Sequence, residues 1–142
     1  MNWTYRKPFE QDLHDKYDAP AKEAVANYLV KLGYEVLPNP DKYGVDLLVM
    51  KGEKEIGVIE VEVRQWSPTC PFSTIHVPER KTKFFNGNSL FFALTKDMGK
   101  AYWIESKEIL KHPLKEVRNV KVTSGELFYD VPTGEFNFVE LV

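Results

Sequence analysis

Three acidic side chains interrupt two strongly apolar segments of the sequence. Residues 45–50 and 56–63 are rich in β-branched and aliphatic side chains and flank a short polar segment, so they predict two antiparallel strands joined by a tight turn. Asp46 begins the first strand, and Glu60 and Glu62 lie late in the second. All three carboxylates are therefore expected at the same end of the pair, where they could hold a cation.

The pairing register of the two strands decides whether these carboxylates meet. A turn that pairs Lys51 with Glu55 places Asp46 opposite Glu60 on one face, whereas a register one residue shorter places Ile59 there. Like charges at the end of apolar strands are costly unless a cation neutralises them. Magnesium favours a few carboxylate oxygens together with waters and phosphate oxygens, so these acids indicate a magnesium site. The alternative is a polar sheet face exposed to water.

An acid at the start of one strand, a turn, and E-x-E or E-x-R late in the next strand resemble the PD-(D/E)XK nuclease superfamily. This superfamily comprises metal-dependent phosphodiesterases that include restriction endonucleases, Holliday-junction resolvases and repair nucleases. The resemblance implies a restriction-endonuclease-like α/β fold with an αβββαβ core over residues 18–105, in which helices flank a mixed central sheet.

The sequence departs from the superfamily pattern at two positions. Val45 stands before Asp46 where many members have proline, and no lysine stands two positions after the second acid. With Glu60 as the second acid, the third position is Glu62, which resembles certain restriction enzymes; with Glu62 as the second acid, it is Arg64. We prefer Glu60, because it is the better candidate to lie opposite Asp46.

The resemblance implies a Mg²⁺- or Mn²⁺-dependent endonuclease that hydrolyses phosphodiester bonds in DNA, with RNA not excluded. The implied metal ligands come from the two strands and the first helix: Asp46, Glu60, the carbonyl of Val61, and Glu23. Glu62 is expected to orient the attacking water or share the metal, and Lys81 or Arg64 to stabilise negative charge in the transition state. Glu23 also fits a solvated glutamate in the first turn of a helix. The alternative function is a non-catalytic nucleic-acid-binding or protein-interaction module that keeps the fold.

A basic segment follows the motif strands. Residues 78–85 predict a short helix with proline at its first position. Because the resemblance places this helix beside the site, Lys81 is the candidate for the displaced motif lysine, and Arg80 and Lys83 are candidates for contact with backbone phosphate. His76 could orient water or phosphate, with a structural hydrogen bond as its alternative. The basic cluster also fits a solvated helix face.

Hydrophobic periodicity and turn signals predict the elements that position these residues. Residues 1–17 are expected to form an arm, and a helix is expected to begin with Asp18 as its N-cap and to end before Gly33. The elements that follow match the αβββαβ order. They are strands at 34–37 and in the motif, the helix at 78–85, strands at 89–95 and 101–105, a helix at 107–111 capped by Ser106, an edge strand at 119–123, and a C-terminal β-hairpin of 126–131 with 136–141.

The composition predicts one globular domain over residues 1–142, with a peripheral C-terminal part at 106–142, because 43% of the residues are hydrophobic and 28% are charged. The formal net charge of −2 argues against a protein that coats nucleic acid by bulk charge.

Cys70 is the one cysteine, which excludes an internal disulfide and fits a reducing cytoplasm. Since no apolar run is long enough to cross a bilayer and the first residues lack the apolar core of a signal peptide, we expect a cytoplasmic protein without membrane contact. The resemblance to the nuclease superfamily implies DNA as the partner, and a homodimer is expected where both strands are cut.

Overall fold

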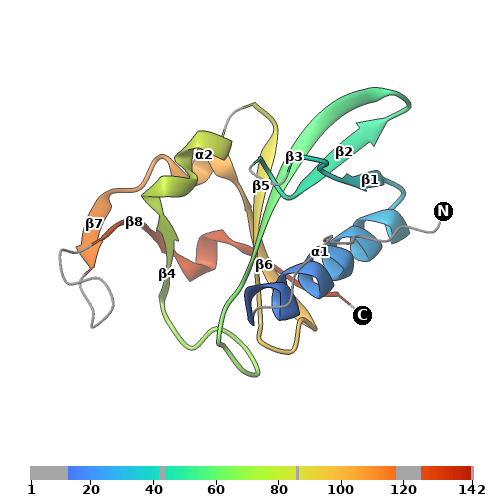
Figure 1. Cartoon of the computed structure of the whole chain (residues 1–142). Coiled ribbons are helices and arrows are strands. Elements are labelled where there is room, and N and C mark those ends of the chain that lie inside the picture. Colours follow the sequence, from blue (N-terminus) through green and yellow to red (C-terminus); the bar gives the residue numbers. More distant parts are fainter. Residues whose placement is uncertain (1–12, 42–43, 86, 118–125, 142) are drawn as a thin grey trace.

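The computed structural model describes residues 13–41, 44–85, 87–117 and 126–141 and has three layers (Figure 1). A long helix, α1 (Leu13–Lys31), lies against one face of a six-stranded sheet, and a three-stranded sheet lies on the opposite side. No helix in the described part of the chain is long and apolar enough to cross a membrane.

The six-stranded sheet has the order β1-β2-β3-β5-β6-β9 and is mixed, because β3 and β5 are parallel while the other neighbours are antiparallel. The second sheet has the order β4-β8-β7 and is antiparallel. The strands of the first sheet are β1 (Glu35–Pro38), β2 (Leu47–Lys51), β3 (Lys54–Val63), β5 (Ser89–Leu94), β6 (Lys100–Glu105) and β9 (Asn137–Glu140). Those of the second are β4 (Thr74–Pro78), β7 (Leu114–Val117) and β8 (Glu126–Pro132). Three short helices complete the part of the fold that the structure describes: η1 (Glu79–Phe84), α2 (Ser106–Ile109) and η2 (Thr133–Glu135).

The core lies on both faces of the central sheet. Because side chains alternate along β5, Phe92 and Leu94 pack toward α1, while Phe91 and Ala93 pack toward the second sheet. All four are fully buried, which confirms the predicted strand with two buried faces. On α1, a stripe of small and aliphatic residues closes the first of these layers, with Ala21, Val25 and Leu29 buried. The central sheet is therefore covered on both sides, and polar residues near its strand ends are partly shielded from water.

The turn between β2 and β3 differs from the predicted turn. Lys51 pairs with Lys54, and Met50 pairs with Glu55, so the predicted pairing of Lys51 with Glu55 is wrong. A β-bulge then leaves Ile56 without a partner in the ladder. Because a bulge inserts one residue into one strand, it shifts the register of every later pair by one.

The first helix begins earlier than the sequence signals predicted. α1 begins at Leu13, so Asp18 is not its N-cap, and Pro20 lies inside the helix. An interior proline removes a single backbone hydrogen bond, and the packing of the apolar stripe on the sheet outweighs that local loss. The predicted arm is therefore helical from residue 13 onward, and its first twelve residues lie outside the described part of the chain.

The helix predicted at 78–85 is shorter and follows an unpredicted strand. Residues 74–78 form β4, in which Ile75 and Val77 are buried against the second layer of the core. Pro78 is the last residue of this strand. Because a proline disfavours helical backbone in the residue before it, Val77 stays extended. The helix that follows, η1, is a 3₁₀-helix that carries the predicted basic residues.

The two C-terminal strands do not form the predicted hairpin. β8 pairs with β4 and β7, whereas β9 pairs with β6 in the other sheet, and η2 connects them. Each strand buries its apolar residues in a different layer: Val131 packs between the sheets, and Val139 packs on the side of α1. The predicted cap of α2 is also wrong, because Ser106 is the first helical residue and its Oγ is buried without a hydrogen-bond partner. The edge strand predicted at 119–123 lies outside the described residues.

Candidate functional site

Asp46 and Glu60 lie beside each other just beyond the last residue pair of β2 with β3. After the bulge at Ile56, Leu47 pairs with Ile59, so the next step along both strands brings Asp46 beside Glu60. The backbone N–H of Asp46 donates to Glu60 Oε2 at 3.1 Å, and the backbone N–H of Val61 donates to Asp46 Oδ2 at 2.8 Å. The two carboxyl groups are therefore fixed by backbone N–H groups of the opposite strand segment.

The loop before β2 holds Asp46 in place. The Asn39 amide donates to the carbonyl of Val45 at 2.9 Å, and the backbone N–H of Asn39 donates to the carbonyl of Asp46 at 3.2 Å. A Cβ on Gly44 would lie 2.7 Å from Asn39 Nδ2, so only glycine allows this close approach without a shift. The position of Gly44 beside the site thus has a steric cause.

Two lysines from opposite sides of the sheet neutralise the acids. Lys22 on α1 lies with its Nζ 3.1 Å from Asp46 Oδ1, and Lys81 on η1 lies with its Nζ 2.9 Å from Glu60 Oε1. The side chains of Lys22 and Lys81 are only 9% and 17% exposed, so these ion pairs are shielded from water. The four charges form a compact, internally paired cluster at the ends of the strands.

The environment raises the pKa of Glu60 from 4.5 to about 7. Burial is the largest cause, because desolvation disfavours the carboxylate form, and the negative charge of Asp46 acts in the same direction. The ammonium of Lys81 opposes both effects and lowers the pKa. Glu60 is thus a carboxyl group whose burial disfavours its ionised form.

The shift in Glu60 predicts a stability that depends on pH in the metal-free protein. Between pH 4.5 and about pH 7 the unfolded chain releases this proton while the folded chain keeps it, so the contribution of Glu60 to stability is fully present below pH 4.5 and is lost as pH rises toward 7. Calorimetric melting in a chelator should show Tm falling over this interval. Glu60→Gln should remove that part of the slope; an unchanged slope in the variant would assign it to other groups.

Glu62 lies beside the cluster but is paired elsewhere. Its Oε1 accepts from Arg64 Nε at 2.7 Å, while its buried Oε2 has no hydrogen-bond partner and lies 4.0 Å from the Nζ of Lys81. Arg64 also donates to the carbonyl of His76 at 2.6 Å and lies over the ring of Trp66. Arg64 is therefore held by three contacts, and it orients Glu62 toward Lys81.

The other basic candidates lie at the surface of η1 and the second sheet. Arg80 pairs with Glu126 at 3.1 Å, with its own side chain 68% exposed, and the Lys83 ammonium lies over the ring of Phe84. His76 Nε2 lies 3.1 Å from Asp130 Oδ1 without forming a hydrogen bond to it, and the His76 ring packs beside that of Phe128.

The first helix supplies a lysine to the cluster where the sequence suggested an acid. Glu23 is exposed and lines a surface hollow with Met98, whereas its neighbour Lys22 points to Asp46. One feature of the sequence points to Lys22. It lies four residues before the buried Ala26, on the buried helix face, and a lysine there needs an anionic partner.

The donor set fits a magnesium or manganese ion. Among the described residues, no group of three or more histidine, cysteine or acidic side chains is arranged to hold a metal. However, Mg²⁺ usually takes one or two carboxylates and completes its shell with waters and substrate phosphate. Asp46 and Glu60 supply that pair of carboxylates, which the backbone N–H groups of Asp46 and Val61 hold in place.

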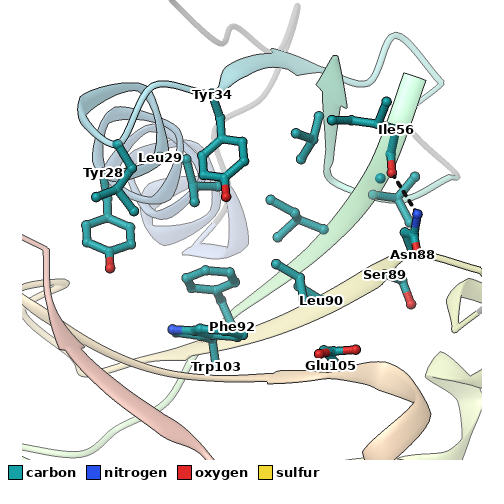
Figure 2. Close-up of a pocket in the computed structure, with 15 residues that line it drawn as sticks. Tyr28, Leu29, Tyr34, Ile56, Asn88, Ser89, Leu90, Phe92, Trp103 and Glu105 are labelled. Atoms are coloured by element: carbon teal, nitrogen blue, oxygen red, sulfur yellow. Dashed lines mark hydrogen bonds between the residues drawn. The ribbon is translucent and has the colours of Figure 1, made fainter. Parts of the chain in front are cut away.

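A separate pocket of about 360 Å³ lies on the α1 side of the sheet (Figure 2). Apolar and aromatic side chains line it, among them Tyr28, Tyr34, Leu90 and Trp103, with the carboxylate of Glu105 at its edge. None of the predicted site residues lines this pocket. The acid and lysine cluster is therefore distinct from it.

Comparison with known proteins bears on the fold. No protein-family model and no curated protein sequence matches this chain. Among solved structures, it is similar to Hjc, a Holliday junction resolvase from the archaeal hyperthermophile Archaeoglobus fulgidus, over 85% of this chain and 88% of that chain, with a TM-score of 0.52 and 10% sequence identity. This chain has a restriction-endonuclease-like fold. The predicted fold class is thereby confirmed, and at this identity the likeness establishes the fold alone.

Proposed function

We propose that this chain is a nuclease that hydrolyses phosphodiester bonds in DNA with Mg²⁺ or Mn²⁺. The observation that carries the proposal is the contact of Asp46 with Glu60 at the strand ends, where the Nζ of Lys81 lies 2.9 Å from Glu60 Oε1. Buried acids with a shifted pKa and a specific charge partner are frequent at functional sites. The restriction-endonuclease-like fold supports the assignment, and the similar resolvase supports DNA as the substrate class.

Asp46, Glu60 and the carbonyl of Val61 would hold the ion. When bound, the ion supplies a Lewis acid for the phosphate and lowers the pKa of a water. The chain's own contribution is rigidity: the backbone N–H groups of Asp46 and Val61 fix the two carboxylates at 3.1 Å and 2.8 Å. Ligands held in this way need little rearrangement when charge develops in the transition state.

Lys81 takes the role of the missing motif lysine in this proposal. Its ammonium lies between two acids, 2.9 Å from Glu60 Oε1 and 4.0 Å from Glu62 Oε2, so it stands close to the position that a lysine at residue 62 would reach. From there it would stabilise negative charge on the phosphate in the transition state. Glu62, held by Arg64, would orient Lys81 and the attacking water.

Cleavage assays with several nucleic acids test this function. Purified protein is incubated with linear duplex, circular, single-stranded and four-way-junction DNA and with RNA, in manganese and in chelator. We expect DNA cleavage that requires the metal. Failure to cut any substrate in manganese, by protein that is folded, would contradict the proposal.

A second candidate function is a non-catalytic DNA-binding module. Two observations favour it: Lys22 and Lys81 pair with the two acids, and glutamate stands where the motif has lysine. Such a module would bind the same DNA with equal affinity in manganese and in chelator and would cut none of it. Calorimetric titration with MnCl₂ separates the two candidates, because the nuclease binds the ion and the module does not.

The exposed cations of η1 should contribute to DNA affinity rather than to chemistry. Replacing Arg80 and Lys83 together by alanine should weaken DNA binding, and it should reduce the slope of log K against log salt by about 0.9 for each phosphate contact that is lost. Fluorescence anisotropy at several salt concentrations measures both quantities. Equal slopes for the variant and the wild type would show that Arg80 and Lys83 do not contact the DNA phosphates.

A further inference from the structure

Lys22 is a buried cation on the helix face that packs against the sheet. The residue is 7% exposed, and its Nζ lies 3.1 Å from Asp46 Oδ1. Lysine is almost never buried to this degree unless it is paired, because removing the ammonium from water is costly. The burial and the pairing together indicate that Lys22 compensates the charge of this carboxylate.

Both oxygens of Asp46 are engaged in the structure. Oδ1 faces the ammonium of Lys22, and Oδ2 accepts the backbone N–H of Val61 at 2.8 Å. The backbone contact is fixed by the position of β3, whereas a lysine side chain can rotate. A cation that binds Asp46 therefore lies beside the ammonium of Lys22 and is repelled by it, and the side chain that can move away is Lys22.

The second lysine of the cluster has an alternative position. Lys81 lies on Glu60 and is also 4.0 Å from Glu62 Oε2, a buried oxygen without a hydrogen-bond partner. It can turn toward Glu62 and remain in the site when positive charge arrives at Glu60. Repulsion between a divalent ion and two neighbouring ammonium groups is therefore relieved chiefly by movement of Lys22.

We propose that Lys22 is an internal counter-ion that Asp46 exchanges for the divalent cation. The inference rests on the proposed function, because it assumes that Asp46 is a metal ligand. In the metal-free protein Lys22 stabilises the folded state and competes with the ion. The same contact thus lowers the metal affinity of the site.

Titration of three proteins with MnCl₂ tests the exchange. Calorimetry compares the chelator-treated wild type with Lys22→Met and with the control Lys31→Met, which removes an exposed lysine from the same helix. Lys22→Met should bind Mn²⁺ about tenfold more tightly than the wild type, the change that corresponds to about 1.4 kcal/mol. Lys31→Met should bind like the wild type. Mn²⁺ should also raise the Tm of Lys22→Met by more than that of the wild type, because a ligand stabilises the folded state according to its affinity.

The possible results separate this inference from the proposed function. If the wild type binds Mn²⁺ and Lys22→Met binds it equally or more weakly, the exchange is wrong and the metal site stands. If none of the three proteins binds Mn²⁺, the metal site and the exchange both fail. Lys22→Gln, which keeps a hydrogen-bond donor without the charge, should show the same gain in affinity and decides the matter if Lys22→Met does not fold.

Discussion

Glu60→Gln and Asp46→Asn should each reduce the rate of metal-dependent DNA cleavage by at least about 10²- to 10³-fold, the loss that follows removal of one preorganised electrostatic contact. Each change keeps the shape of the side chain but removes a carboxylate from the only pair of acids that meets at these strand ends in the described part of the chain. Single-turnover cleavage of a labelled duplex in manganese measures the loss.

Glu105→Gln is the matched control for these two variants. Glu105 is an exposed glutamate whose side chain pairs with Lys107 at the surface, so its loss should leave the cleavage rate within about twofold of the wild type. Circular dichroism should show that all three variants are folded. Wild-type cleavage rates in both Glu60→Gln and Asp46→Asn would remove these residues from the reaction.

Lys81→Met should give the second large effect, a fall of about 10²-fold or more in the cleavage rate with Mn²⁺ binding retained. The ammonium is expected to act on charge that develops in the transition state, so its loss should appear in the rate rather than in the affinity for metal. The fold should survive, because in the metal-free protein Glu60 without its lysine can bind a proton, which Mn²⁺ displaces when it binds: Lys81 lowers the pKa of Glu60, and removing it raises that pKa further. Metal titration and single-turnover kinetics on the same preparation separate the two quantities.

Lys111→Met is the control for Lys81→Met, since Lys111 is exposed and pairs locally with Glu108. It should cleave DNA at the wild-type rate. A Lys81→Met protein that cleaves at the same rate as Lys111→Met would leave the catalytic cation to another residue, and Arg64 would be the next to test.

The contact between Asp46 and Glu60 could be predicted from the sequence, but the turn and the β-bulge that produce it could not. Apolar alternation predicted both strands and the end at which the acids gather. The predicted turn was wrong at Lys51, and the bulge at Ile56 compensates for the difference, so that Leu47 pairs with Ile59. A bulge depends on the packing of both strands with their neighbours, and a single strand's pattern does not contain that information.

Long-range pairing explains the remaining differences. The segments that form β8 and β9 were each predicted as strands, yet their partners are β4 and β6, which lie far away in the sequence. Turn signals reveal only neighbours along the chain. Lys22 was missed for a related reason, since a lysine on an apolar helix face is informative only when the opposing carboxylate is known.

The central claim is that Asp46 and Glu60 bind one divalent ion between them, and a crystal structure of the protein grown with MnCl₂ tests it most directly through the anomalous signal of manganese. We predict a manganese peak bound by carboxylate oxygens of both residues, at about 2.1 Å for an ion of this class, with the ammonium of Lys22 displaced from Asp46. A map without a peak at these acids, in which Lys22 and Lys81 remain on Asp46 and Glu60, would contradict it.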